Sequence, residues 1–256
     1  MKKALLGAVT LAVMGAPAFA ADLPARTYAP PAKAPAMVAQ IYDWSGFYIG
    51  LNAGGGWNRS CWTNTALFGV TLPSTSEGCL TGSGGTAGGQ VGYRWQSDNW
   101  VFGIEAQGNW ADFDGTAASL AFPFVTNQMK VDAFGLFTGQ VGYAWNNALF
   151  YLKGGAALTD NKYAGIVTAT GLQLGTANDT RWGGTVGVGI EYGFAPNWSA
   201  AVEYDHLFMA TQNVGFTGVA PGNLGLATRN DSIDQNIDMV TARVNYRFGG
   251  PVVARY

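Results

Sequence analysis

The sequence predicts an all-β protein, an eight-stranded antiparallel up-and-down transmembrane β-barrel with short periplasmic turns and long extracellular loops. Three observations predict this fold. Apolar and polar residues alternate with period two over stretches of about ten residues. Very short connections alternate with long polar ones along the chain. Charged residues make up only 12 % of the chain, whereas soluble domains carry about 25 % and need that charge to cover their surface.

Composition narrows the protein class further. The chain has 256 residues with 37 glycines, 13 % aromatic residues and a net charge of -2. No basic field exists that would attract nucleic acid, so nucleic acid is not an expected partner. Long charge-free stretches, such as residues 133–152, contain glycines and amides and alternate in polarity, which is unlike a membrane-spanning helix.

The N-terminus predicts export from the cytoplasm. Lys2 and Lys3 precede an apolar run over residues 4–16, and Ala18-Phe19-Ala20 fits the small-x-small cleavage pattern of a signal peptide. We therefore expect a signal peptide over residues 1–20, cleaved near Ala20. Residues 21–43 are rich in proline and alanine and predict an extended periplasmic leader. The barrel is expected over residues 44–248, followed by a short tail over residues 249–256.

The first four strands are expected at residues 46–57, 85–95, 100–110 and 130–145. The first is glycine-rich with alternating apolar residues, and the second and fourth share a repeat, GQVGYRW at 89–95 and GQVGYAW at 139–145. The third, WVFGIEAQGNW, begins at Trp100 and ends at Trp110, with Glu105 on its polar face. Ten steps of about 3.3 Å, tilted by about 40°, cover roughly 25 Å, the height of an outer-membrane crossing. We expect Glu105 to face the barrel interior, the lumen, with an Arg or Lys partner.

The last four strands are expected at residues 148–159, 181–194, 198–208 and 237–248. Each alternates apolar and polar residues, and every even-numbered strand of the eight ends in Tyr-x-aromatic. Three of these endings lead into very short connections, so aromatic residues collect at one end of the barrel. The predicted periplasmic aromatic belt consists of Tyr93, Trp95, Trp100, Tyr143, Trp145, Tyr192, Phe194, Trp198, Tyr246 and Phe248. Phe248 is expected to close the last strand, although Tyr256 is an alternative end signal.

The connections at the opposite end are long and polar. Residues 58–84, 111–129, 160–180 and 209–236 are rich in Gly, Thr, Asn and Asp and are expected to be loops. The first of them contains the only two cysteines, Cys61 and Cys79. Export permits their oxidation, and a disulfide between them could stabilise the fold by about 3 kcal/mol.

The polar faces of the strands carry both signs of charge. Parity assigns five basic and five acidic residues to a lumen charge network: Arg94, Lys130, Lys153, Arg243 and Arg247 with Glu105, Asp132, Glu191, Glu203 and Asp205. Paired charges suit a lumen of side-chain width, because each buried charge needs a partner. The soluble alternative is a lipocalin-like barrel, whose outer face would carry the charges and whose lumen would be apolar.

Three segments of the chain resemble a known family. They are WSGFYIGLNAGGGW at residues 44–57, ADLP at residues 21–24, and NYRF at residues 245–248. Together they resemble the outer-membrane immunogenic proteins of alphaproteobacteria, small porin-like barrels of the OmpA transmembrane type. The resemblance implies an outer-membrane location in a Gram-negative envelope and exposed surface loops. Some relatives are described as porins and others as haem binders, and no catalytic site is implied.

The sequence contains few residues that could form a catalytic or metal site. His206 is the only histidine, and although it follows Asp205, no complete catalytic or zinc-ligand set is evident. We expect no enzyme activity, no metal and no cofactor. The function predicted is structural and surface-interacting, with a lumen filled by paired charges. The alternatives are a narrow porin for water and small ions, a haem or small-ligand binder, and a lipid-modifying barrel enzyme. Expected partners are outer-membrane lipid and lipopolysaccharide, the barrel assembly machinery, and host or environmental surface ligands.

Overall fold

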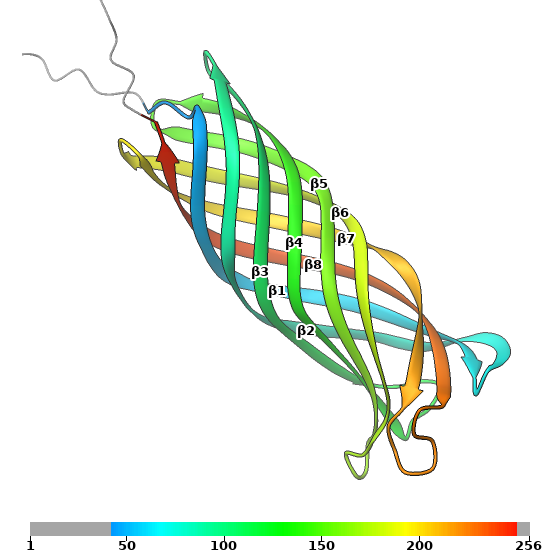
Figure 1. The fold of residues 1–256 in the computed structure, drawn as a ribbon. Coiled ribbons are helices and arrows are strands. Elements are labelled where there is room, and N and C mark those ends of the chain that lie inside the picture. Colours follow the sequence, from blue (N-terminus) through cyan, green and yellow to red (C-terminus); the bar gives the residue numbers. More distant parts are fainter. Residues whose placement is uncertain (1–41, 250–256) are drawn as a thin grey trace, which may run out of the picture. The chain divides into compact units, whose positions relative to one another are not determined.

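The computed structural model describes residues 42–249, which form a closed barrel of eight antiparallel strands (Figure 1). The strands are β1 (Gly46–Leu67), β2 (Val70–Ser97), β3 (Trp100–Ala118), β4 (Val125–Trp145), β5 (Ala148–Val167), β6 (Gln173–Ala195), β7 (Trp198–Gly218) and β8 (Ala227–Phe248). Each strand pairs with the next in sequence, and β8 closes the ring against β1. Within these residues no helix is long and apolar enough to cross a membrane. The predicted signal peptide, residues 21–41 of the leader and residues 250–256 of the tail lie outside the described residues.

One end of the barrel has the three two-residue connections 98–99, 146–147 and 196–197, and we call it the turn end and the opposite one the far end. At the turn end, the strand boundaries lie close to the residues that the alternation predicts. Asp98 and Asn146 adopt positive φ angles of 54° in two of these turns. A positive φ suits Asp and Asn better than most residues, which explains their place in such tight connections.

The predicted far-end loops are wrong in extent, because most of their residues continue the strands. The connections there are only residues 68–69, 119–124, 168–172 and 219–226. Gly, Thr and Asn are common in loops, yet Thr also favours strands, and alternating polar residues suit a strand with one face in water. The barrel is therefore about twice as long as a membrane crossing requires, and the β1–β2 hairpin extends beyond its neighbours (Figure 1).

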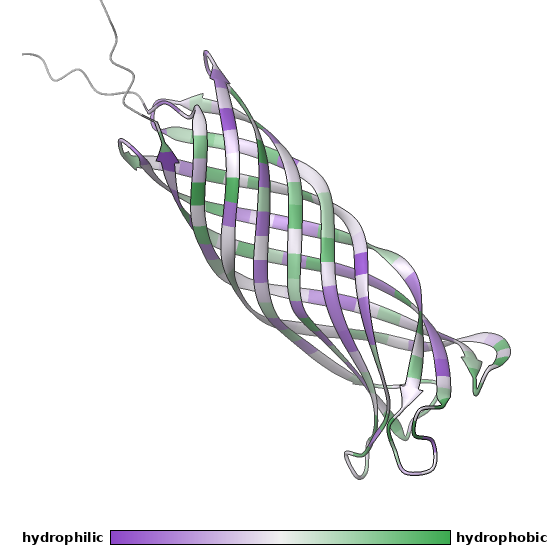
Figure 2. Cartoon of the chain, in the orientation of Figure 1, coloured by the Kyte–Doolittle hydropathy of each residue, from purple (hydrophilic) through white to green (hydrophobic). Residues whose placement is uncertain are grey.

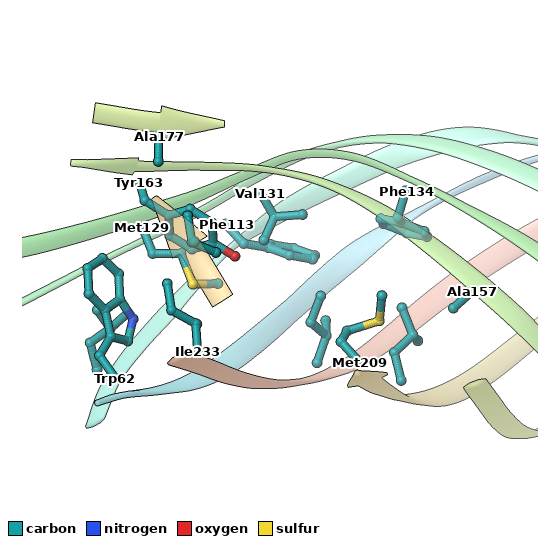
Figure 3. Packing of buried hydrophobic residues seen from close by; sticks show 14 of the residues in the cluster. Trp62, Phe113, Met129, Val131, Phe134, Ala157, Tyr163, Ala177, Met209 and Ile233 are labelled. Atoms are coloured by element: carbon teal, nitrogen blue, oxygen red, sulfur yellow. The ribbon is translucent and has the colours of Figure 1, made fainter. Parts of the chain in front are cut away.

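The barrel wall has opposite polarity in its two halves. In the half near the turn end, large apolar side chains such as Leu51, Ile104 and Leu152 are exposed on the outside, and the lumen is polar. In the far half the lumen is filled by an apolar core that includes Trp62, Phe113 and Met129 (Figure 3). Figure 2 shows the alternation of hydropathy along each strand that produces both arrangements.

Two of the predicted lumen residues, Lys130 and Asp132, lie outside the lumen because of a bulge in β4. The pairing of β4 with β5 shifts between Val131 and Ala133, so the side-chain parity of β4 changes at Asp132. One extra residue moves every later side chain to the other face. Lys130 and Asp132 consequently lie on the outside of the barrel, where Lys130 Nζ is 2.8 Å from Asp112 Oδ1.

Candidate functional site

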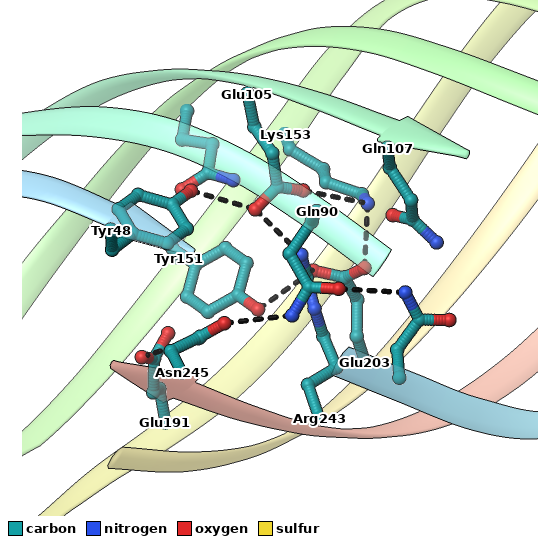
Figure 4. A network of polar contacts seen from close by, with 12 residues as sticks. Tyr48, Gln90, Glu105, Gln107, Tyr151, Lys153, Glu191, Glu203, Arg243 and Asn245 are labelled. Carbon is teal, nitrogen blue, oxygen red and sulfur yellow. Dashed lines mark hydrogen bonds and ion pairs between the residues drawn. The ribbon is translucent and has the colours of Figure 1, made fainter. Parts of the chain in front are cut away.

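The lumen of the turn-end half contains a buried charge network, which we define as Arg94, Glu105, Lys153, Glu191, Glu203, Asp205 and Arg243. Figure 4 shows five of them, Glu105, Lys153, Glu191, Glu203 and Arg243. Alternation within β2, β3 and β5–β8 turns all seven side chains inward. Each of these residues is at most 5 % exposed. The predicted lumen set thus contains all seven, together with Lys130 and Asp132 from the bulged strand and Arg247 from the turn end.

Glu105, the charge in the middle of β3, lies between two cations. Its Oε2 atom is 2.6 Å from Arg243 Nη2, and its Oε1 atom is 3.9 Å from Lys153 Nζ. Arg243 also pairs with Glu203 through its other terminal nitrogen. Lys153 Nζ lies 2.6 Å from Glu203 Oε1 and 3.1 Å from Asp205 Oδ1. Two cations therefore meet three carboxylates at this level of the barrel.

A second ion pair lies nearer the turn end. Arg94 Nη1 is 2.8 Å from Glu191 Oε2, and Arg94 Nε donates to Gln140 Oε1 at 3.1 Å. The guanidinium carbon of Arg94 is 4.6 Å from the ring centroid of Tyr48. Such contacts matter more in a water-poor lumen than at a surface, because the ring face attracts a desolvated cation.

Neutral side chains complete the network, and parity arguments about charge alone missed them. Tyr48 donates to Glu105 at 2.6 Å, and Tyr151 donates to Glu203 at 2.7 Å. Next to them, an amide chain links Gln107, Asn109, Asn52, Gln90 and Asn245 through hydrogen bonds of 2.6–3.0 Å. The sequence signal for them was their inward parity, which they share with the charged residues.

A glycine makes room for the charges. A Cβ atom on Gly187 would collide with the Asp205 carboxylate and lie 3.0 Å from Lys153 Cε. A side chain at this lumen position would therefore displace the Lys153–Asp205 pair.

The turn end of the lumen is closed by residues just before β1. Tyr42 and Trp44 are 6 % and 2 % exposed, with ring centroids 4.5 Å apart. The backbone amide of Tyr42 donates to Asn147 in the β4–β5 turn at 3.2 Å, and that of Trp44 donates to Gln96 near the end of β2 at 2.9 Å. Arg247 lies here, and its guanidinium donates to the backbone oxygen atoms of Ser45 and Pro196 at 3.1 Å each. We call Tyr42, Trp44 and Arg247 the turn-end stopper.

The predicted aromatic belt lies on the outside at the turn end. Nine of its ten residues, Tyr93, Trp95, Trp100, Tyr143, Trp145, Tyr192, Phe194, Trp198 and Phe248, are exposed by 45 % or more. Tyr246 is less exposed because it packs between Trp198 and Phe248, with ring centroids 5.0 Å from each. Amphipathic aromatic rings favour the interface between a membrane and water.

A second ring of exposed aromatics, which we call the far belt, was only partly predicted. It comprises Trp57, Trp110, Trp182 and Phe208, exposed by 50–77 %. Only Trp110 was expected there. The sequence feature that could have predicted the far belt is an aromatic residue ten or twelve positions from a turn-end aromatic on the same strand, as with Trp198 and Phe208. The two belts bracket an apolar outer band about 25 Å high, the height of an outer-membrane barrel.

His206 lies beside the far belt and points outward, whereas the adjacent Asp205 points into the lumen. Its carboxylate partner is instead Asp238, whose Oδ1 atom is 2.6 Å from His206 Nδ1. Tyr204 donates to the same oxygen at 2.6 Å. Among residues 42–249, no group of three or more His, Cys, Asp or Glu side chains could hold a metal ion.

Near the far end, the lumen holds a second polar group, which we call the tip cluster: Glu77, Arg229, Asp231, Asn64 and Asn127. Arg229 lies 3.1 Å from both Glu77 Oε2 and Asp231 Oδ2. Burial raises the pKa of the Asp231 carboxyl to about 7, with Arg229 opposing the rise and Glu77 adding to it. The two cysteines lie on the same half of the barrel, where Cys61 and Cys79 are direct cross-strand partners joined by a disulfide.

Comparison with known proteins agrees with this architecture. Residues 6–248 match the family described as outer membrane protein beta-barrel domain. The chain is 28 % identical to a 31 kDa outer-membrane immunogenic protein of Brucella melitensis over 97 % of this chain and all of that one. It is 28 % identical to a 25 kDa outer-membrane immunogenic protein of Brucella abortus, over 87 % of this chain and 92 % of that one.

Solved structures of outer-membrane proteins align with the barrel. OprG of Pseudomonas aeruginosa covers 82 % of this chain and all of its own, at 13 % identity and a TM-score of 0.49. Ail of Yersinia pestis covers 80 % of this chain and 99 % of its own, at 12 % identity and a TM-score of 0.39. With an eight-stranded barrel, an exposed apolar band and a family match over nearly its whole length, the chain belongs to the outer-membrane β-barrel protein family and is a relative of the outer-membrane immunogenic proteins.

Proposed function

We propose that this protein is a closed structural barrel that anchors a rigid surface-exposed platform in the outer membrane. In bacterial barrels the short turns face the periplasm, so the far half of this barrel stands outside the cell. The observation that carries the proposal is the filling of the lumen along its whole length. A solute would meet the turn-end stopper, then the charge network and the amide chain, and then the apolar core.

Each filling opposes conduction for a different physical reason. The charge network consists of ion pairs and charged hydrogen bonds that an ion would have to break in a water-poor lumen. The far-half lumen is also filled: Phe113, Met129 and Ile233 are fully buried there, together with polar residues such as Arg181 and Gln235 that are already hydrogen-bonded. Its packing is tight, with Trp62 and Tyr163 in edge-to-face contact at 5.5 Å (Figure 3). An ion would therefore have to cross a layer of paired charges and then a tightly packed, mainly apolar layer.

The extracellular half supports a role in surface interaction. Its strands continue the membrane barrel, and the disulfide between Cys61 and Cys79 ties the longest hairpin. Phe68, Leu120 and Leu224 at the tips are exposed by 70–75 %, and we propose that together they offer apolar contacts to a partner, as contiguous apolar surface does in other proteins. Two of the relatives are named immunogenic proteins. The proposed external partners are host or environmental surface molecules that meet these tips.

Lipid contacts follow from the belts and from the charges just outside the far belt. Lys130 and Lys162 lie on the outside and pair with Asp112 and Asp132. We place them at the level of lipopolysaccharide head groups. Phe248 ends β8 with an exposed ring. We propose that the barrel assembly machinery recognises this end of the strand.

We propose no catalytic role for His206. His206 and Tyr204 both hydrogen-bond to Asp238 in a local group on the outer surface of the barrel. A group of this kind stabilises polar side chains at a membrane interface. It needs no substrate to explain it.

Single-channel recording in a planar bilayer tests the closed lumen. The refolded protein is expected to give no stable conductance steps, and Arg243→Ala and Glu105→Ala are compared with it. Stable wild-type openings whose size changes in these variants would replace the closed barrel with a narrow porin.

The structural role has its own test in the native cell. A deletion strain is expected to become sensitive to detergent and to a chelator of divalent cations. Wild-type protein should restore resistance, and so should Leu224→Ala, which alters an exposed tip residue only. A deletion strain with unchanged resistance would contradict a role in envelope integrity.

A further inference from the structure

The extracellular end of the barrel carries an apolar and uncharged surface, which we call the crown. It consists of residues 68–76, 119–124, 168–172 and 219–226, the four connections of the far end together with the start of β2 (Figure 1). None of these residues is Asp, Glu, Lys, Arg or His. Each connection presents large apolar side chains, and those exposed by 48–75 % include Phe68, Val70, Leu120, Phe124, Leu172 and Leu224. A water-facing surface of this kind commonly marks a contact with a protein or a membrane.

Backbone hydrogen bonds join the four connections of the crown into a ring. Each bond links one connection to a different hairpin. The amide-to-oxygen bonds run from Phe68 to Thr228, from Leu120 to Glu77, from Thr168 to Phe124 and from Val219 to Leu174, at 2.9–3.2 Å. The crown is therefore one surface rather than four independent loops. These bonds also satisfy backbone groups that would be costly to leave unpaired in contact with hydrocarbon.

The backbone of Phe68 indicates that its side chain serves contact rather than folding. Phe68 and Gly69 form the two-residue turn between β1 and β2, with φ angles of 49° and 80°. Asn-Gly is the favoured pair in such a turn, and a positive φ disfavours a bulky side chain. In the other tight turns of residues 42–249 the positive φ falls on Asp98 and Asn146, as expected. The Phe68 ring is 70 % exposed, so little packing offsets the strain, and unexplained strain of this kind points to function.

The composition of the crown narrows the class of partner. Energetically important residues of protein–protein interfaces are enriched in Trp, Tyr and Arg, and the crown contains none of these. An anionic partner would need basic residues, which are also missing. The charged residues that follow the crown segments in the chain, Glu77 and Arg229, are buried in the lumen and paired at 3.1 Å. What the crown offers is Phe, Leu and Val among Gly, Ser and Thr, which matches a neutral surface with an apolar interior.

We propose that the crown inserts into the outer leaflet of an apposed lipid bilayer whose surface is zwitterionic phospholipid. Phe and Leu side chains on amphipathic segments enter the boundary between head groups and acyl chains by about 5–10 Å. A bilayer is fluid and can surround side chains that project from four separate connections, whereas a folded protein would need matching hollows. The inference rests on the proposed function, which places the far half outside the cell, and it names the partner of the exposed tips as the lipid surface of another cell.

The test is co-flotation of nanodiscs that carry the full-length protein with vesicles of phosphatidylcholine. Nanodiscs with the protein are expected to float with the vesicles, and empty nanodiscs are expected to stay behind. Adding phosphatidylserine to the vesicles should not increase binding, and high salt should not release the protein, because the crown has no charges that could pair with lipid.

Variants of the crown separate binding from folding. Phe68→Asn should weaken vesicle binding at least about ten-fold, since it removes a large apolar side chain from the contact. The same variant should not lower the midpoint of urea unfolding, because Asn suits the positive φ of this turn. The triple variant Phe68→Asn/Leu120→Ser/Leu224→Ser should not bind. Ser74→Ala, at an exposed polar position of the crown, is the matched control and should bind like the wild type.

Four results would overturn the proposal. They are wild-type nanodiscs that do not float with the vesicles, flotation that needs phosphatidylserine or is lost at high salt, equal flotation of the triple variant, and nanodiscs that associate with one another without vesicles. The last result would assign the crown to a second copy of this chain. Heat-modifiable gel mobility checks that each variant is folded. Failure of the lipid contact leaves the closed barrel standing, because its readout is conductance.

Discussion

Arg243 should be far more important to stability than Glu105, although the two form one ion pair. The charge network around them holds Lys153 and Arg243 against Glu105, Glu203 and Asp205. Glu105→Gln leaves two cations facing two carboxylates, and the new amide oxygen can still accept from Tyr48 and Arg243. Arg243→Met leaves Lys153 alone with three carboxylates.

The expected magnitudes follow from burial. Arg243 is 2 % exposed and contacts two carboxylates, so removing it strands buried charge and should lower the free energy of unfolding by about 3–5 kcal/mol. Glu105→Gln exchanges charged hydrogen bonds for weaker ones and corrects the charge excess, so we expect a loss of about 1 kcal/mol. Lys162→Met, which removes an exposed ion pair on the outside, should leave the unfolding midpoint unchanged.

The assay is urea unfolding of the refolded protein in detergent micelles, followed by the gel mobility of unheated samples and by tryptophan fluorescence. Unfolding and refolding curves must coincide before free energies are compared. If Glu105→Gln costs as much stability as Arg243→Met, the reasoning from charge count is wrong. The pairs would then act as independent hydrogen bonds rather than as one charge-coupled group.

Three further predictions concern the extracellular half. Reducing the Cys61–Cys79 disulfide, which links residues 18 apart, should lower the free energy of unfolding by about 3 kcal/mol in urea titrations with and without reductant, and the Cys61→Ser/Cys79→Ser double variant should not respond to reductant. Because the pKa of Asp231 is about 7 in the folded barrel against an ordinary 3.8, the folded state holds this proton more tightly than the unfolded chain, so the free energy of unfolding should fall as pH rises from about 4 to about 7; Asp231→Asn should remove that slope, and an unchanged slope would assign it to other groups. A membrane-impermeant maleimide on intact cells should label Lys130→Cys and leave Lys153→Cys unlabelled, and the reverse pattern would refute the β4 bulge.

The eight strands could be predicted because side chains in a membrane barrel alternate between lipid and lumen, so that polarity alternates along the sequence with a period of two residues. At the turn end the signal was strong, since the connections are two residues long and flanked by aromatics such as Trp95 and Trp100. At the far end the same strands leave the membrane, and their outer faces become polar. Residues such as Thr63 and Asn64 then resemble a loop in composition while remaining paired with β8.

The candidate site was predictable wherever parity is unbroken. Glu105, Glu203 and Arg243 lie on regular stretches of strand, and their inward orientation follows directly from alternation. Lys130 and Asp132 do not, because one extra residue in β4 reverses parity and leaves no mark in composition. In the turn-end stopper, Arg247 was predicted to face the lumen, but the packing of Tyr42 was not, because it lies in a proline- and alanine-rich segment with no period to reveal its packing.

The reversal of polarity between the two halves has a consequence for how the barrel reaches its final position. The far half must cross the bilayer before the apolar outer band can settle in it. Once across, it carries Lys130, Lys162 and Asp112 on its outer surface, and drawing them back through hydrocarbon would cost about 2–4 kcal/mol for each lysine at the midplane. The outward-facing charges of the far half are therefore expected to oppose its return through the bilayer once the barrel is inserted.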